Sequence, residues 1–558
     1  MKSFAALFER LDQTTKTNEK VAAMTEYFSA CWSGQATPST RVDGAWALYY
    51  LSGRRGRRLI PTTRLRQWAA EAAGIPDWIF DESYDVVGDL AETITLVVPA
   101  SGDPVQRSLT EWIERHVMAL SSLDEAQQRD AITAMWRQSD GTPRLILMKL
   151  ITGAFRLGVS AKLVSRAIAN ATGLPRDVIA HRCMGQWQPS ETFVETLLSS
   201  DTGDAVDGRP YPFCLAHAVP VAGDDPTQGD PVAAAIGAIE EFVAEWKWDG
   251  IRGQVIRRNR TTHIWSRGEE LMNGRWPEVE TAAESLPDGT VIDGEILASR
   301  LVNDLTEYPT GVQVLPFAQL QRRIGRKTVG KKLLGEVPVM FHAFDCLESD
   351  GIDIRDRPLS VRQAKLKELI DATEPPNLIF NPSIDATSWS DLVDIRASSR
   401  QRHAEGLMLK RRDSIYHVGR VRGSWWKWKV APYTVDAVLI YAQRGHGRRA
   451  SLYTDYTFAV WDAGELVPFA KAYSGLTDAE IARVDRFVRE NTSERFGPVR
   501  AVTPQLVMEL AFEGLQRSTR HKSGIATRFP RIVRWRTDKQ PADADRLADL
   551  LTMLPDSA

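Results

Sequence analysis

The sequence predicts a multidomain protein with an all-α N-terminal domain, a central α+β domain and a C-terminal β-barrel. Three observations carry this prediction. The chain has 558 residues, which is too many for one ordinary hydrophobic core. Apolar residues recur at helical spacing up to about residue 200, whereas strand-like stretches begin near residue 241. Residues 201–231, which are rich in Gly, Pro and Asp, separate the two patterns.

The N-terminal domain, placed at residues 1–205, is predicted to be helical throughout. Apolar side chains at positions 4, 7, 8 and 11 repeat with the three- and four-residue spacing of one helix face. The stretches 112–120 and 147–172 continue this spacing, with few β-branched alternations between them. We therefore expect about ten helices in this domain.

The central domain, placed at residues 206–430, is predicted to mix strands with helices. Phe242–Trp246 has the pattern of a strand and leads into Asp249-Gly250, a hairpin turn signal, which is followed by a strand at Ile251–Arg257. A helix is expected at Val361–Leu369. Further strands are predicted at residues 261–265, 291–297, 337–345 and 407–410.

The C-terminal domain, placed at residues 431–558, is predicted to be a small barrel. A helix at 477–490 interrupts a series of strand-like stretches. Five strands with an inserted helix fit a Greek-key barrel of the OB-fold type. The strands are expected at residues 435–441, 451–461, 468–473, 507–512 and 532–535.

Charge is balanced over the chain but uneven along it. The 70 Lys and Arg against 72 Asp and Glu give a formal net charge of −2, which argues mildly against a nucleic-acid-binding protein. Three basic clusters together indicate phosphate-binding surfaces, although any one alone could be a solvated face. The clusters are Arg54, Arg55, Arg57, Arg58, Arg64 and Arg66; Arg322, Arg323, Arg326, Lys327, Lys331 and Lys332; and Arg528, Arg531, Arg534, Arg536 and Lys539.

Cysteine usage and hydropathy bear on the compartment. The four cysteines lack C-x-x-C spacing, which argues against a zinc site or a disulfide framework and fits a reducing compartment. No stretch approaches the roughly 18 apolar residues of a transmembrane helix. Glu9 and Arg10 precede any apolar core, so no signal peptide is expected. We predict a cytoplasmic protein with no membrane partner.

The most informative segment is Glu245-Trp246-Lys247-Trp248-Asp249-Gly250-Ile251-Arg252. A lysine that ends a strand just before a tight turn is held rigidly and can point into a cleft. To act as a nucleophile its amine must lose a proton, against a reference pKa of about 10.4. The nearby Arg252 and partial burial would favour that loss. A surface hairpin with a solvated lysine would show the same pattern, so this segment alone leaves both interpretations open.

Further short motifs follow in a fixed order. They are Ser266-Arg267-Gly268, Asp293-Gly294-Glu295, Phe341-His342-Ala343-Phe344-Asp345, Glu405–Lys410, Trp425–Lys429, and Arg528-Phe529-Pro530-Arg531 running to Lys539. In order and spacing, and together with the segment around Lys247, they resemble the motifs of the ATP-dependent DNA ligases, within the covalent nucleotidyltransferases. Along nearly the whole chain the arrangement is similar to the ligase I type, and the Ala, Arg and Trp usage resembles that of bacterial members.

The resemblance implies an enzyme that seals nicks with a 5′-phosphate and a 3′-hydroxyl in duplex DNA. ATP would adenylate Lys247, the AMP would pass to the 5′-phosphate, and the 3′-hydroxyl would displace it. Residues 1–205 would be the DNA-binding domain, 206–430 the adenylation (nucleotidyltransferase) domain and 431–558 the OB-fold domain. We expect a monomer that closes around the nicked DNA, associated with the nucleoid if the protein is bacterial.

The resemblance also implies residues for the base and the metal. Glu245 would accept a hydrogen bond from the adenine amino group, where guanine would present a carbonyl. Phe344 would stack on the purine, unless it is a core aromatic like the nearby Phe341. Glu295, near the ribose, and Glu405 would bind Mg²⁺, or Mn²⁺ in its place, because hard cations prefer carboxylate oxygen.

Cationic residues would bind the phosphates. Lys427 and Lys429 alternate along a strand, so both would face the α-phosphate, with Trp428 on the opposite side. Arg252 would hold the ribose end, Arg267 would contact the 5′-phosphate of the nick, and Arg422 would add to the ATP site. Pyrophosphate would be oriented by Arg531, Arg536, Asp538 and Lys539, and DNA would be bound by Arg54, Arg55, Arg57, Arg58, Arg156 and Arg267.

Several alternatives share part of this pattern. An RNA ligase or an mRNA capping guanylyltransferase uses the same lysine chemistry, but the helical domain before the core disfavours both. Glu245 and the last motif also disfavour capping. A non-catalytic nick-binding scaffold is disfavoured by the intact set of charged motif residues. NAD-dependent ligases normally carry zinc-ligand cysteines, which this sequence lacks, so ATP is the expected nucleotide.

Overall fold

The computed structural model divides into two compact units. One consists of Met1–Thr172, Pro189–Val194 and Pro432–Ala558, and the other of Gly173–Gln188 and Glu195–Ala431. Among the helices described, none is both long enough and apolar enough to cross a membrane. The structure describes the whole chain except residues 55–57, 101–103, 154, 156, 184–186, 200–207, 221–228, 307, 309, 327–328, 446–448, 450, 520 and 555–558.

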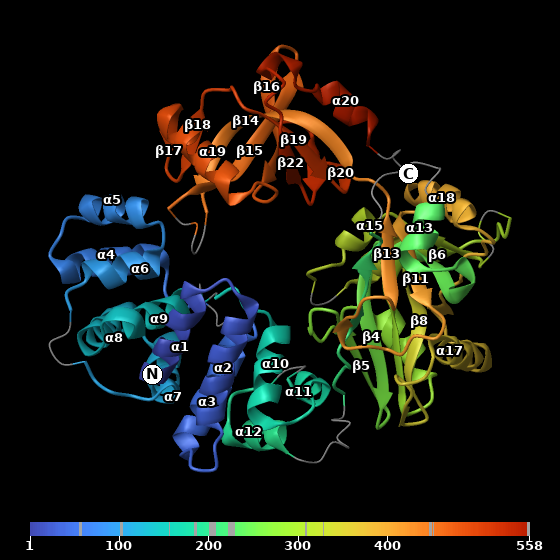
Figure 1. Ribbon diagram of the computed structural model, residues 1–558, viewed down its shortest axis with the longest axis horizontal. Helices are drawn as coiled ribbons and strands as arrows, with labels where there is room; N and C mark the ends of the chain where they lie inside the picture. The colour runs from blue at the N-terminus through green and yellow to red at the C-terminus, as the bar shows by residue number, and fades with distance from the viewer. Residues whose placement is uncertain are drawn as a thin grey trace. The chain divides into compact units, whose positions relative to one another are not determined.

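The regular elements described between Lys2 and Leu198 are all helical, as predicted (Figure 1, blue to teal). The buried face of the first helix consists mainly of the apolar residues expected from their spacing, Phe4 to Leu11. The helical spacing at 112–120 corresponds to a π-helical turn at Trp112–Val117 and a 3-10 turn at Met118–Ser122. The α-helices are α1 (Lys2–Gln13), α2 (Thr17–Cys31), α3 (Pro38–Leu51), α4 (Thr62–Ala73), α5 (Asp77–Val87), α6 (Leu90–Val97), α7 (Leu109–Glu111), α8 (Glu125–Gln138), α9 (Gly141–Thr152), α10 (Ala161–Thr172), α11 (Arg176–Arg182) and α12 (Glu191–Leu198).

The central part of the chain contains strands and helices, as predicted. Its strands are β1 (Cys214–Leu215), β2 (His217–Ala218), β3 (Phe242–Trp248), β4 (Ile251–Arg258), β5 (Thr261–Ser266), β6 (Thr290–Leu301), β7 (Val312–Val314), β8 (Val339–Ser349), β9 (Ile352–Asp353), β10 (Leu378–Phe380), β11 (Ala404–Arg411), β12 (Gly419–Arg420) and β13 (Trp425–Lys429). Its helices are α13 (Gly229–Ile236), α14 (Pro277–Glu284), α15 (Phe317–Gln321), α16 (Lys331–Glu336), α17 (Leu359–Thr373) and α18 (Trp389–Ala397).

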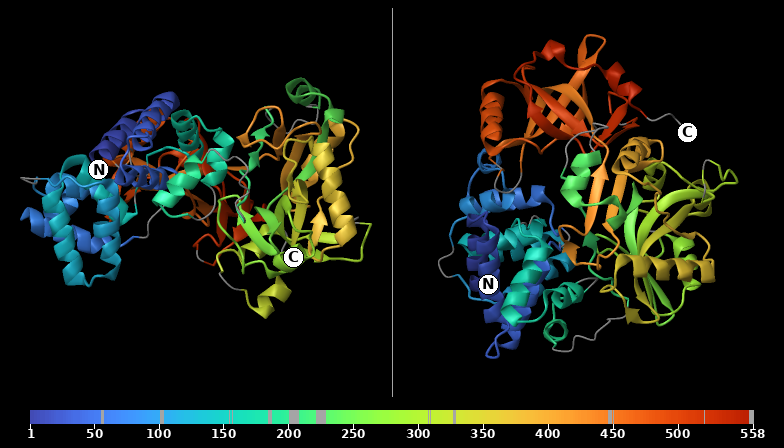
Figure 2. Two further views of the ribbon diagram at one scale, coloured as in Figure 1. Left: turned by 90° about the horizontal axis from the view of Figure 1, so that it is seen from below. Right: turned by 45° about the vertical axis from the view of Figure 1, so that its right-hand side comes forward.

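Two sheets position the residues of interest. The first has the strand order β10-β8-β6-β4-β5, and α14 and α17 cover one of its faces, where Val279 and Leu366 share a core with Phe341 (Figures 1 and 2). The second has the order β2-β13-β11-β3, and one of its faces packs on α18 through Leu407, Trp428 and the helix residue Trp389. On the opposite faces, Val291 and Leu347 of the first sheet share a further core with Trp425 of the second.

The predicted hairpin at Asp249-Gly250 is wrong. β3 pairs with β11, whereas β4 pairs with β5 and β6, so the turn connects two different sheets. Gly250 is needed there for close packing, because a Cβ at this position would meet the carbonyl oxygen of Ile296 at 2.5 Å and Cγ of Glu295 at 2.8 Å. A short Asp-Gly sequence signals a turn, but it does not determine which strands pair afterwards.

The C-terminal part is β-rich with one inserted helix, as expected, but it has more strands than predicted. Its main sheet has seven strands, in the order β16-β15-β14-β18-β17 with β19 beside β14 and β22 beside β19. The spacing of apolar residues did not predict the hairpin β17–β18, because β17 is almost fully exposed and has no buried side of apolar residues. The elements are β14 (Tyr433–Arg444), β15 (Tyr453–Asp462), β16 (Glu465–Ala472), α19 (Asp478–Glu490), β17 (Thr492–Phe496), β18 (Val499–Val502), β19 (Val507–Phe512), β20 (Gly514–Arg517), β21 (Ile525–Arg528), β22 (Arg531–Trp535) and α20 (Leu547–Thr552).

Candidate active site

Strand alternation places the charged residues of the second sheet on one face. Met408 of β11 pairs with Glu245 on one side and with Lys427 on the other, and Gly406 pairs with Lys429. The intervening residues point the opposite way, where Leu407 and Trp428 are buried in the core against α18. The side chains of Lys427 and Lys429 therefore share a face with Lys247, the next residue but one after Glu245.

Lys247, near the end of β3, lies against the carboxylate of Glu405. Its Nζ is 2.5 Å from Oε2 of Glu405, and Nζ of Lys429 is 3.2 Å from the same oxygen. Lys247 keeps 22% of its side-chain area exposed, so its amine is accessible from solvent. One carboxylate oxygen thus holds the amine of Lys247 beside a second cation.

The surroundings of these lysines are electropositive. Burial lowers the pKa of Lys427, and the nearby Arg420, Lys429 and Lys247 lower it further. Burial would raise the pKa of Glu405, but Lys247 and Lys429 outweigh that effect and hold the pKa of Glu405 below its ordinary value. An ionised Glu405 among several cations suits the binding of a polyphosphate.

The first sheet supplies a second group of charged residues. Arg252 of β4 pairs in register with Glu295 of β6. Its guanidinium donates from Nε and Nη2 to the two oxygens of Asp293, at 3.1 and 2.7 Å, and from Nη1 to the carbonyl of Cys214 at 2.7 Å. The guanidinium carbon lies 5.4 Å from the ring centre of Phe344. Arg252 is therefore held rigidly beside that ring.

Phe344 occupies a bulge in β8. Asp293 pairs with Asp345 and Gly294 pairs with Ala343, so Phe344 has no partner on β6. Phe341 is fully buried in the core under α14 and α17, whereas Phe344 is only partly buried and belongs to the opposite face. Phe341 is thus the core aromatic, and Phe344 is left on the side of Arg252.

Glu245 lies in a buried polar network. Its Oε1 accepts a hydrogen bond from Nε2 of Gln363 at 2.9 Å, and its Oε2 accepts from Nδ2 of Asn381 at 3.0 Å and Nζ of Lys410 at 2.8 Å. The same Nζ lies 3.9 Å from the ring centre of Phe344. Gln363 and Asn381 were missed by the sequence analysis, because isolated amides outside the motifs give no recognisable pattern.

Glu295 has an unusual environment for a carboxylate. Burial raises its pKa to about 8, although Lys247 and Arg252 favour its charged form. The pKa of an unfolded glutamate is lower, so the folded protein binds this proton more tightly than the unfolded chain does. The free energy of unfolding should therefore fall as pH rises from about 5 to about 8, by up to about 1.4 kcal/mol per pH unit from this residue.

Glu295→Gln should remove this contribution. We expect the unfolding midpoint of the wild-type protein to drop faster than that of the variant over this pH range, measured by denaturant titration without nucleotide. If the unfolding midpoints of the two proteins changed with pH in parallel, Glu295 would already be ionised at pH 5, and this prediction would be wrong.

The carboxylates of Glu295 and Glu405 offer the kind of oxygen that a hard divalent cation prefers. Glu405 contacts Lys247, and Lys247 and Glu405 both influence the pKa of Glu295. In the part of the chain that the structure describes, no group of three or more His, Cys, Asp and Glu side chains could hold a metal ion. A cation bound by Glu295 and Glu405 would therefore need oxygen ligands from outside the chain, such as phosphate or water.

The other residues singled out in the sequence are divided between the two units. Arg267 directly follows β5, and its backbone N–H donates to the carbonyl of Arg252 at 3.0 Å; Arg267 and Arg422 are both exposed. Arg54 and Arg58 belong to the unit that contains the N-terminal helices, whereas Arg55, Arg57 and Arg156 lie outside the described residues. The residues of the last motif, Arg531, Arg536, Asp538 and Lys539, also belong to the unit that does not contain Lys247.

The last motif has its own ion pairs. Arg536 contacts Asp538 at 2.7 Å and Asp436 at 2.8 Å, and Lys539 contacts Asp436 at 2.6 Å. Arg531 contacts Glu513 at 3.0 Å. These pairs hold Arg536 and Lys539 against Asp436 of β14, and Arg531 of β22 against Glu513 between β19 and β20.

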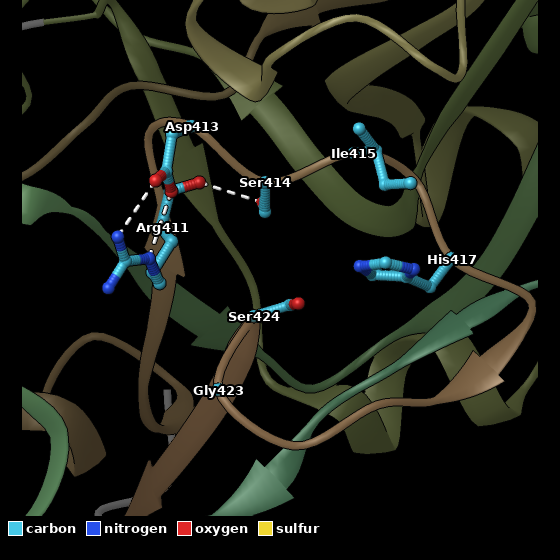
Figure 3. A pocket seen from close by; sticks show the side chains of 7 residues that line it. All are labelled: Arg411, Asp413, Ser414, Ile415, His417, Gly423 and Ser424. Carbon is cyan, nitrogen blue, oxygen red and sulfur yellow. Dashed lines mark hydrogen bonds and ion pairs between the residues drawn. The ribbon is translucent and has the colours of Figure 1, made fainter.

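A polar pocket lies beside the loop that joins β11 to β12. It has a volume of about 380 Å³, and Figure 3 shows its lining residues. Arg411 pairs with Asp413 on one side, and His417 lies across from them. The lining residues are Arg411, Asp413, Ser414, Ile415, His417, Gly423 and Ser424.

Comparisons with known proteins find similar DNA ligase sequences along most of the chain. A family described as "DNA ligase N terminus" matches residues 1–169, "ATP dependent DNA ligase domain" matches 230–429, and "ATP dependent DNA ligase C terminal region" matches 449–539. A "Probable DNA ligase" of Koribacter versatilis is 32% identical over 98% of this chain and 95% of its own length. "DNA ligase 1" of Korarchaeum cryptofilum is 27% identical over 98% and 97%. The solved structure "Pmar-Lig_PreS3" has a TM-score of 0.60 at 15% identity, covering 95% of this chain and 99% of its own, which shows a shared fold.

Proposed function

The chain belongs to the family of ATP-dependent DNA ligases, and from this membership we propose that Lys247 is the residue that carries AMP. As a member of this family, the chain is an enzyme that uses ATP to form phosphodiester bonds in DNA. One observation supports Lys247 above all. Lys247 lies near the end of β3, on the strand face that it shares with Lys427 and Lys429. Its accessible amine contacts Glu405.

In the proposed first step the amine of Lys247 attacks the α-phosphorus of ATP. An N–P bond forms, the bond to pyrophosphate breaks, and the amine gives up its proton. Glu405 is the nearest acceptor for that proton, at 2.5 Å. Lys427 and Lys429 neutralise the charge that develops on the α-phosphate.

The purine would lie against Phe344. Among the described contacts, Oε1 of Glu245 accepts one hydrogen bond, so a second lone pair remains for the amino group of adenine. Guanine would place a carbonyl oxygen against this carboxylate and be repelled. Arg252, fixed by Asp293, would hold the ribose end.

Glu295 and Glu405 would hold Mg²⁺, or Mn²⁺ in its place, and the bound ion would neutralise phosphate charge. The AMP on Lys247 would then pass to the 5′-phosphate of a nick, which Arg267 would contact. Attack by the 3′-hydroxyl would form the phosphodiester bond and release AMP. Arg422 would add a further cation to the nucleotide site.

The remaining parts would serve DNA binding and pyrophosphate release. We assign residues 1–205 to DNA binding, 206–430 to adenylation and 431–558 to an OB-fold domain. Arg54, Arg55, Arg57, Arg58 and Arg156 would contact DNA phosphates. A hinge near Val430–Pro432 would let Arg531, Arg536, Asp538 and Lys539 reach pyrophosphate and withdraw, in a monomer that closes around nicked DNA in the cytoplasm.

The test is the intact mass of the protein after incubation with ATP and Mg²⁺. We expect a gain equal to one AMP, which disappears when nicked duplex DNA is added and sealed DNA appears. GTP in place of ATP should give no adduct, and a nick in duplex RNA should discharge the AMP poorly. An unmodified mass under these conditions would contradict the proposal.

A further inference from the structure

A buried tyrosine completes the surroundings of Arg252. Tyr416 lies in the loop that joins β11 to β12 and is 4% exposed. Its hydroxyl donates to Oδ2 of Asp293 at 2.5 Å, and the same oxygen accepts from Nη2 of Arg252 at 2.7 Å. Arg252 and Asp293 lie on adjacent strands, so the tyrosine adds a contact from a separate loop.

The loop that carries Tyr416 is fixed at several points. The backbone N–H of Tyr416 donates to the carbonyl of Arg355 at 2.8 Å, and the carbonyl of Ser414 accepts from Nη1 of Arg362 at 2.9 Å. The ring of Tyr416 packs edge-on against Trp425, with ring centres 5.9 Å apart. Its neighbours Ile415 and His417 line the pocket of Figure 3. The hydroxyl is thus aimed by a packed loop.

The direction of the hydrogen bond is also determined. Burial raises the pKa of Tyr416 well above its ordinary value, and the adjacent Asp293 raises it further. The hydroxyl therefore stays protonated and acts as the donor. Asp293 is fully buried, so its oxygens depend on the donors around it for their hydrogen bonds.

We propose that Tyr416 is a positioning residue for ATP, which acts by fixing Asp293 and through it the guanidinium of Arg252. The inference rests on the proposed function of Arg252 at the ribose end. Nε, Nη1 and Nη2 of Arg252 donate to Asp293 and to the carbonyl of Cys214, and Nη2 also lies 3.5 Å from the hydroxyl oxygen of Tyr416. The N–H group of Nη1 that these contacts leave can meet the ribose only if the guanidinium plane is held, and Tyr416 holds the carboxylate that sets this plane.

The same chain contains a matched arrangement at the other end of β4, in the same core cluster as Tyr416. Arg258, six residues after Arg252 on β4, forms an ion pair with Glu348, and the hydroxyl of Tyr211 donates to Glu348 at 2.7 Å. Tyr211 is 6% exposed, so it is about as buried as Tyr416. Removing either hydroxyl should disturb the fold to a similar degree.

The experiment compares Tyr416→Phe with Tyr211→Phe in the full-length protein. We expect Tyr416→Phe to raise the KM for ATP in self-adenylation about 10-fold, while kcat changes by less than about 3-fold. The variant loses the hydrogen bond to the charged Asp293, and this loss should weaken the binding of ATP equally in the ground state and in the transition state. Tyr211→Phe should leave both constants unchanged. Thermal unfolding of both variants gives the loss of stability due to the missing hydroxyl alone.

A double-mutant cycle separates a positioning role from a structural one. If Tyr416 acts through Arg252, Tyr416→Phe should add little to the KM of Arg252→Lys. Equal KM values for Tyr416→Phe and Tyr211→Phe, or additive effects in the cycle, would overturn the inference. Should Tyr416→Phe fold poorly, Asp293→Asn tests the same link. Failure of the wild-type protein to form an AMP adduct would instead reject the proposed function itself.

Discussion

Lys247→Arg is expected to abolish the covalent AMP adduct and to lower DNA joining by about 10⁴-fold or more, the scale seen when a nucleophile is removed. Arginine keeps the positive charge and the ion pair with Glu405. Its guanidinium stays protonated at any accessible pH and has no free electron pair to attack phosphorus. The measurement is intact mass with ATP and Mg²⁺, together with sealing of a labelled nick.

Two controls make this result specific. Lys332→Arg changes a lysine that is 91% exposed and should leave adduct formation unaltered. A nick whose 5′-phosphate already carries AMP needs no adenylated lysine, so the variant should still seal part of it. An adduct on Lys247→Arg, or peptide mapping that places AMP on another residue, would remove Lys247 from the mechanism.

Glu405→Gln is expected to raise the Mg²⁺ concentration needed for half-maximal adenylation about 10- to 100-fold. The change removes one of the two carboxylates assigned to the cation and the negative charge beside Lys247 and Lys429. Glu405 is also the nearest proton acceptor for Lys247, at 2.5 Å, so the adenylation rate should stay reduced even at saturating Mg²⁺. Adenylation rates over a range of Mg²⁺ concentrations measure both effects.

The control for Glu405 is another ion-paired glutamate. Glu336 pairs with Arg322 on the surface of the same unit, and Glu336→Gln should change neither the Mg²⁺ dependence nor the rate at saturating Mg²⁺. A lower rate for Glu405→Gln with an unchanged Mg²⁺ dependence would limit Glu405 to orienting Lys247.

The sequence predicted the strand face of the site because alternation is a local property. Lys427 and Lys429 are two residues apart on one strand, so knowing the strand was enough to place both on one side and Trp428 on the other. The helical N-terminal region was predictable for the same reason, since the spacing of its apolar residues repeats along the chain.

Pairing between distant segments could not be predicted in this way. The Asp249-Gly250 turn looked like a hairpin, but β3 pairs with β11, which lies far away in the sequence, whereas β4 pairs with the following strands β5 and β6. Tyr416, Gln363 and Asn381 are single polar residues outside the motifs, and only the folded chain brings them to Asp293 and Glu245. The exposed strand β17 was missed because it has no buried stripe.

The turn between β3 and β4 limits how the site can move. Lys247 and Arg252 are five residues apart, which spans at most about 18 Å of fully extended chain. Gly250 packs directly on the backbone of β6, so this connection has little slack. We therefore expect rearrangements that admit or release substrate to occur elsewhere, while Lys247 and Arg252, the residues proposed to attack ATP and to hold its ribose, stay within this distance of one another.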